Sequence, residues 1–113
     1  MLTNGKESRE FLYADDCSNA LFEIMRRFSF FKKKNVELHL TTAKKTKIIE
    51  IAKIIKKILS KRNIHIKIKP LTTNDNLQKN VNNKSNKYLL KFWKPKFKVE
   101  QGIEKIIDYY QKR

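Results

Sequence analysis

The stretch from residue 48 to residue 59 restricts the fold of this chain more than any other feature. Five apolar side chains recur there at helical spacing, opposite a row of lysines: Ile48, Ile51, Ala52, Ile55 and Leu59. This pattern is typical of an amphipathic helix with one buried face. Thr46 lies in a favourable place for its N-cap. The sequence therefore predicts a helix over residues 48–59 within a packed fold.

Shorter patterns surround this helix. Residues 9–14, 36–40 and 64–68 alternate between apolar and other side chains, as short strands do, and the third run stops before Pro70. Helical spacing returns over about residues 16–28, 85–92 and 99–111, and Pro95 disfavours helix at the residue before it. Residues 71–84 are polar and aperiodic, which predicts a loop. The order of these segments predicts a small α/β domain over residues 1–113, with short strands and about four helices.

The first helical segment has its own expected start, core face and end. Asp15 and Asp16 suit its cap and first turn. The lysines at residues 32–34 predict a turn after it. Trp93 is expected to close the core rather than to stack on a base. The stripe that we expect this helix to bury is Ala20, Leu21, Ile24, Met25 and Phe28.

The composition limits the expected partners, metal sites and cellular compartment of the protein. The 113 residues carry a formal charge of +16, which invites a nucleic-acid interpretation. The charge is nearly all lysine and is scattered along the chain, so we give more weight to solvated lysine faces than to a nucleic-acid partner. The single Cys17 supports neither a disulfide framework nor a zinc site. Without a signal peptide or a membrane-length apolar run, we expect a cytoplasmic protein with no membrane partner.

Four short strings occur in the order found in one enzyme family. Residues 9–16, R-E-F-L-Y-A-D-D, resemble R-[DE]-F-[IL]-Y-V-D-D, and residues 48–52, I-I-E-I-A, resemble the centre of S-I-x-E-[LI]-A. Residues 85–95, ending K-F-W-K-P, are similar to D-x-S-K-A-x-x-x-L-G-W-x-P; residues 99–103, V-E-Q-G-I, with D-Y-Y at 108–110, are similar to L-E-E-G-[LI]…W-Y. The chain thereby resembles about the last third of the extended short-chain dehydrogenase/reductases, the NAD(P)-dependent nucleotide-sugar epimerases, dehydratases and GDP-fucose synthases. It departs from them in lacking glycines at residues 41–45 and in carrying Phe92 where glycine is common.

The resemblance implies a substrate-binding role. Arg9 would contact the diphosphate of a nucleotide sugar, since a guanidinium fork matches phosphate oxygens, and Tyr13 would line the same pocket. Lys79, with Gln78 beside it as a hydrogen-bond donor, would complete the phosphate clamp from the long loop. Alternatives without ligand binding stay open for these residues: Arg9 as a surface residue paired with a neighbouring glutamate, Tyr13 as a half-buried aromatic, and Lys79 as a solvated lysine.

The catalytic parts of such an enzyme are missing from the sequence. The family's hydride chemistry needs a Gly-rich turn that holds the cofactor pyrophosphate and a Tyr-x-x-x-Lys pair, and the sequence contains neither. We therefore predict a substrate-binding subdomain that lacks the Rossmann half and has no catalytic residue, metal site or cofactor of its own, NAD(P) belonging to the complete enzyme. Its expected partners are a nucleotide-diphosphate sugar and that Rossmann half. Two alternatives are a small basic nucleic-acid-binding protein and a non-functional truncated remnant.

Overall fold

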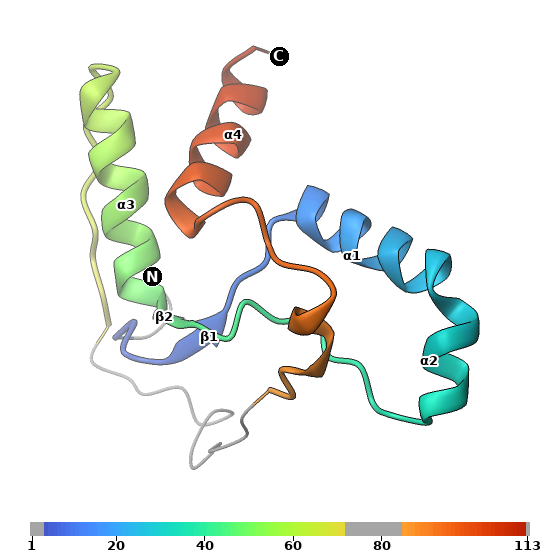
Figure 1. Ribbon diagram of the computed structural model, residues 1–113. Coiled ribbons are helices and arrows are strands. Elements are labelled where there is room, and N and C mark those ends of the chain that lie inside the picture. Colours follow the sequence, from blue (N-terminus) through green and yellow to red (C-terminus); the bar gives the residue numbers. More distant parts are fainter. Residues whose placement is uncertain (1–3, 72–84, 113) are drawn as a thin grey trace.

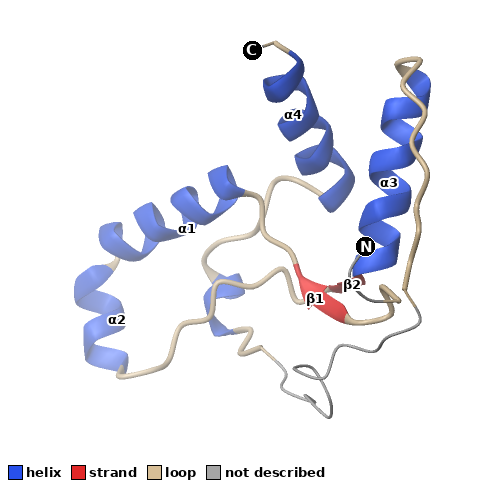
Figure 2. Ribbon diagram, turned by 180° about the vertical axis from the view of Figure 1, so that it is seen from behind, coloured by secondary structure: helices blue, strands red, loops and turns tan. Residues whose placement is uncertain are grey.

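The computed structural model describes residues 4–71 and 85–112. In this part of the chain the elements are β1 (Ser8–Glu10), α1 (Ala14–Arg26), α2 (Phe28–Lys34), β2 (Lys45–Lys47), α3 (Ile48–Lys61), the short 3-10 helix η2 (Tyr88–Lys91) and α4 (Val99–Gln111). The described residues thus form four α-helices and a two-stranded antiparallel sheet, which confirms the predicted mixture of helix and strand (Figure 1, Figure 2). None of these helices combines the length and apolar character needed to cross a bilayer.

The sheet of β1 and β2 anchors the start of α3. Arg9 lies opposite Thr46 in the register. Just beyond β2, the first two backbone N–H groups of α3 donate to the carbonyls of Glu7 (3.0 Å) and Gly5 (2.8 Å), which satisfies amides that a helix start leaves unpaired. The N-cap of α3 is Lys47. The prediction of Thr46 as N-cap was wrong by one residue, because β2 continues through Lys47 and α3 begins directly after it at Ile48.

α1 and α2 are separated by a bend at Arg27, whose φ of −109° and ψ of 24° depart from helical values. The lysines at residues 32–34, which we predicted to form a turn, are the last turn of α2. Cations are favourable there because the carbonyl end of a helix carries partial negative charge. The helix ends one residue later at Asn35, with a left-handed φ of 49°, a conformation that asparagine tolerates better than most residues.

The two strands predicted over residues 36–40 and 64–68 were wrong, since neither run joins a sheet among the described residues. Alternation reports on the faces of side chains, but a strand also needs a second backbone to pair with. Residues 36–40 are held instead by Asn86, whose side-chain amide donates to the carbonyl of Glu37 (3.0 Å). The actual partner of β1 is Lys45–Lys47, whose polar residues gave no strand signal.

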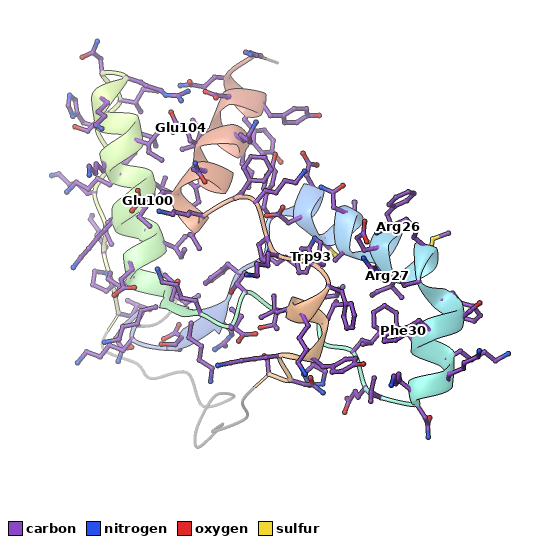
Figure 3. All side chains as sticks on the ribbon, in the orientation of Figure 1. Arg26, Arg27, Phe30, Trp93, Glu100 and Glu104 are labelled. Carbon is purple, nitrogen blue, oxygen red and sulfur yellow. The ribbon has the colours of Figure 1, made fainter. Side chains whose placement is uncertain are left out.

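The C-terminal part follows the prediction more closely. The helix predicted over residues 99–111 is α4, and the break at Pro95 is confirmed. The helix predicted over residues 85–92 was wrong in extent, because only the four residues of η2 are helical. α3 and α4 lie side by side in both views (Figure 1, Figure 2). Arg62 joins their distal ends, with its Nη2 2.6 Å from Asp108 Oδ1 and 3.9 Å from an oxygen of Glu104, which Figure 3 labels.

A small core lies where α1, α2 and η2 meet. Its buried apolar residues are Ala20, Phe31, Leu89 and Trp93. Figure 3 shows Trp93 near the middle of the molecule, and its burial confirms the prediction that it closes the core. The ring of Phe92, the C-cap residue of η2, packs edge to face on the buried Phe31, with the two centroids 5.2 Å apart.

Much of the apolar stripe of α1 is exposed, contrary to prediction. Ala20 is buried, but Leu21 and Met25 are 50% and 74% exposed, and Phe28, which lies at the start of α2 and not in α1, is 60% exposed. Phe22, outside the predicted stripe, is 63% exposed. The part of α1 that packs on the core is therefore narrower than its apolar pattern.

Candidate functional site

Arg9, the predicted diphosphate ligand, lies in the middle of β1. Its side chain is half-buried, and Nη1 donates to the carbonyl of Ser8 (3.3 Å). Directly opposed residues of an antiparallel pair present their side chains on one face. Arg9 therefore shares its face of the sheet with the buried Thr46.

Tyr13, the second predicted site residue, is the N-cap of α1 and lines an apolar cleft. Its ring meets that of Phe97 edge to face at a centroid distance of 5.0 Å. It also packs on Gly102 of α4, where an added Cβ would lie 3.2 Å from the ring. The cleft has a volume of about 320 Å³, and its lining includes five isoleucines of α3 and α4. Arg9 does not line it.

The other two predicted ligands, Gln78 and Lys79, lie outside the described residues. The phosphate clamp therefore stays a prediction. The described segments on either side of residues 72–84 are residues 64–71, which follow α3, and Ser85, whose hydroxyl donates to Glu10 at the end of β1.

A buried carboxylate joins α1 to the segment before α4. Asp16 is 0% exposed, and its two oxygens accept the backbone N–H groups of Lys96 (2.9 Å) and Phe97 (3.0 Å). Asp16 lies in the first turn of α1, as predicted. Beyond that position, its carboxylate holds together two parts of the chain that are 80 residues apart in sequence.

A second carboxylate, Glu10 at the end of β1, joins three segments. Its Oε2 accepts the hydroxyls of Thr41 (2.8 Å) and Ser85 (2.6 Å). The Thr41 hydroxyl also accepts the backbone N–H of Ala43 (2.9 Å), a residue with a left-handed φ of 58°. Glu10 thus fixes the turn before β2 and the start of the segment that leads to η2.

Asn86 and His39 form a third junction. The Nδ1 atom of His39 accepts the backbone N–H of Asn86 (2.9 Å), and its Nε2 lies 3.1 Å from Glu37 Oε1. The Asn86 side chain accepts the N–H of Tyr88 at the start of η2 (2.7 Å). The Nδ1 bond and the Asn86 amide therefore hold residues 36–40 against the segment that begins η2, while the Nε2 contact lies within residues 36–40.

An exposed ion pair closes the last turn of α1. Arg26 Nη2 lies 2.7 Å from Glu23 Oε2, and Arg27 approaches the same oxygen at 3.4 Å. The hydrogen bond from Arg26 lowers the pKa of Glu23 below its ordinary value of 4.5, and the same bond raises the pKa of Arg26. Figure 3 shows Arg26 and Arg27 at this end of α1, with Phe30 on α2 below them.

These junctions are structural in their chemistry. Both oxygens of Asp16 accept backbone N–H groups and Oε2 of Glu10 accepts two hydroxyls, so these carboxylates hold segments of the chain together. Across residues 4–71 and 85–112, no three His, Cys, Asp or Glu side chains gather closely enough to hold a metal ion. What the junctions provide is a rigid setting for β1 and for the segments on either side of it.

Sequence reasoning did not anticipate the long-range roles of Asp16, Glu10 and Gly102. A signal for Asp16 existed, because it lies four and eight residues before Ala20 and Ile24, on the helix face that packs on the core. For Glu10 no local pattern was available, since both of its partners lie more than 30 residues away.

Neither a protein-family model nor a curated protein matches this chain.

Proposed function

We propose that this chain is the nucleotide-sugar-binding portion of an NAD(P)-dependent sugar epimerase, dehydratase or reductase, and that it acts together with a cofactor-binding half. The observation that carries the proposal is that the strings of the resemblance, distant in sequence, contact one another. Asp16 of the first string binds the backbone just after the third. Tyr13 of the first packs on Gly102 of the fourth. Contacts of this kind are expected when the strings are parts of one folded unit.

The turn before β2 supports the same proposal. The enzymes that the chain resembles commonly have glycines in this turn, and Ala43 stands there instead. Its φ of 58° is in the left-handed region that favours glycine. The backbone at Ala43 thus has a conformation that glycine adopts more readily than alanine.

Arg9 is the proposed ligand of the sugar diphosphate. Its guanidinium keeps its charge at any physiological pH and offers parallel donors to phosphate oxygens. β1 holds its backbone in register, and Glu10 ties the end of that strand to two other segments. A ligand that is itself flexible and charged is best recognised from such a fixed position.

The exposed apolar surface of the chain supports the proposal that it docks with a cofactor-binding half. Large apolar side chains of α1 are at least half exposed, namely Leu21 (50%), Phe22 (63%) and Met25 (74%). Among the described residues the buried apolar core is limited to Ala20, Phe31, Leu89 and Trp93. A docked cofactor-binding half would cover further apolar surface, in the manner of a large obligate interface.

Titration of the full chain tests this proposal. GDP- and UDP-sugars are added in calorimetry, and a single-stranded oligonucleotide is added separately at about 50 and about 200 mM salt. We expect saturable binding of a nucleotide sugar that is lost in Arg9→Gln and retained in Arg26→Gln. The second variant removes the same charge from an exposed position on α1.

Two results would contradict the proposal. Tight oligonucleotide binding with a steep salt dependence, and no response to any nucleotide sugar, would identify a nucleic-acid-binding protein. No binding of either ligand, together with a broad thermal transition, would indicate a non-functional remnant.

A further inference from the structure

Two hollows meet on the surface near the starts of α3 and α4. The first has a volume of about 370 Å³ and lies between the turn before β2 and the segment that leads to α4. The second, of about 580 Å³, continues along the first turns of α3 and α4. Lys44 and Lys98 line both hollows. We call this surface the lysine hollow, and its cationic residues are Lys44, Lys45, Lys53, Lys94 and Lys98.

The ammonium groups of the lysine hollow have no carboxylate partner among residues 4–71 and 85–112. Two glutamates line the second hollow, but Glu50 accepts the backbone N–H of Lys47 (3.4 Å) at the start of α3. The other, Glu100, belongs to the first turn of α4 and is labelled in Figure 3. Positive charge therefore exceeds negative charge where the two hollows join.

The lysines come from segments that the fold fixes relative to one another. Lys44 follows a turn in which the Thr42 hydroxyl accepts its N–H (3.3 Å) and donates to its carbonyl (3.1 Å). Lys98 follows directly after the two backbone amides bound by the buried Asp16. These positions are roughly 50 residues apart in sequence, so their approach is a product of the tertiary structure.

The lysines on the outer face of α3 differ in their surroundings from the lysines of the lysine hollow. Lys56, Lys57 and Lys61 border a separate, shallow surface hollow and all belong to one helix, and Lys53 lies on the edge between this hollow and the lysine hollow. Side chains one turn apart on one helix reach outward into solvent, where salt and water screen their charges. In the lysine hollow, cations from three segments surround a concave surface, and such a surface concentrates the field on an anion.

We propose that the lysine hollow binds a compact anion with several phosphate groups, at a site separate from Arg9. The mutual repulsion of the ammonium groups falls when a multivalent anion lies among them. Lysine serves here as a point charge that reaches any phosphate oxygen. Two joined hollows suit a phosphate chain that extends from one into the other. The shared chemistry is that of free polyphosphate, a nucleotide tail or a nucleic-acid backbone.

Calorimetric titration of the full chain with inorganic tripolyphosphate tests the site. The test variant is Lys44→Gln with Lys98→Gln, and the matched control is Lys56→Gln with Lys57→Gln, which removes the same charge from the outer face of α3. Circular dichroism confirms equal helix content in both. We expect saturable binding that falls by about tenfold or more in the test variant, which is the loss of at least one charged hydrogen bond, and by less than about twofold in the control.

Two other outcomes would contradict the proposed site, and a third would identify the source of the phosphates. Equal losses in test and control variants would show that binding follows net charge alone, and the proposal fails. An equal loss in Arg9→Gln would place the anion at the proposed sugar-diphosphate site and so remove the second site. If an oligonucleotide binds more tightly than tripolyphosphate and shows the same pattern of variants, the phosphates recognised are those of a nucleic acid and the site stands.

Discussion

The buried carboxylate of Asp16 offers the sharpest test of how this open fold is held together. Hydrogen bonds to a charged acceptor contribute about 1.5–3 kcal/mol each, and Asp16 accepts two, from the amides of Lys96 and Phe97. Asp16→Ala should therefore cost about 3–6 kcal/mol, close to the whole stability of a small domain at about 5–15 kcal/mol. Asp16→Asn keeps one acceptor oxygen and should cost about 1.5–3 kcal/mol.

Asp15→Asn is the matched control for this measurement. Asp15 is exposed, lies in the same first turn and carries the same charge, so its loss removes only the interaction with the helix dipole, about 0.3–1 kcal/mol. Urea unfolding monitored by circular dichroism gives the free energy of unfolding for each variant. If Asp16→Asn and Asp15→Asn agree within about 0.5 kcal/mol, the two amide bonds do not hold the segment and the reasoning is refuted.

Three further measurements examine the core, the contact between α1 and α4, and the turn before β2. Phe31→Ala should lose about 3–5 kcal/mol of unfolding free energy because Phe31 is 6% exposed, whereas Phe22→Ala at 63% exposure should change little; equal losses would contradict the assigned core. Gly102→Ala should gain less than the about 1 kcal/mol that helix propensity provides, because the new Cβ would lie 3.2 Å from the Tyr13 ring, and in a Tyr13→Ala background it should gain the full amount; equal effects in the two backgrounds in denaturant unfolding would exclude the contact. Ala43→Gly should raise the thermal midpoint by relieving a left-handed φ of 58°, a gain of about 0.5–1 kcal/mol after the entropy of glycine is subtracted, and a lowered midpoint would argue against that backbone.

The helices could largely be predicted because their information is local. The bounds of α3 and α4 agree almost residue for residue with the prediction, since the apolar spacing lies within each segment, although no side chain of α3 is fully buried. The strands could not be predicted in the same way. Residues 36–40 alternate but have no paired strand among the described residues, whereas Lys45–Lys47 does not alternate and yet pairs with β1. Strand pairing depends on a second segment whose approach no local pattern encodes.

The candidate site likewise has properties that the sequence could predict and properties that it could not. Its residue types, Arg9 on an extended run and Tyr13 just before a helix, could be proposed from the sequence because charge and side-chain chemistry are fixed by residue type. Their surroundings could not. Tertiary structure alone placed Tyr13 against Gly102 and the cleft between α3 and α4, apart from Arg9.

The amphipathic segment around Ile51 determined by itself that the chain contains a helix with one apolar and one lysine face. The sequence could not determine how much of each apolar face is covered, and Met25 at 74% exposure shows that a helical stripe is not the same as a core. Nor could it determine that lysines near residues 44 and 98 approach a common hollow. Local periodicity sets which side of a helix is apolar, but burial and charge clustering depend on which distant segments meet, and only the folded chain decides that.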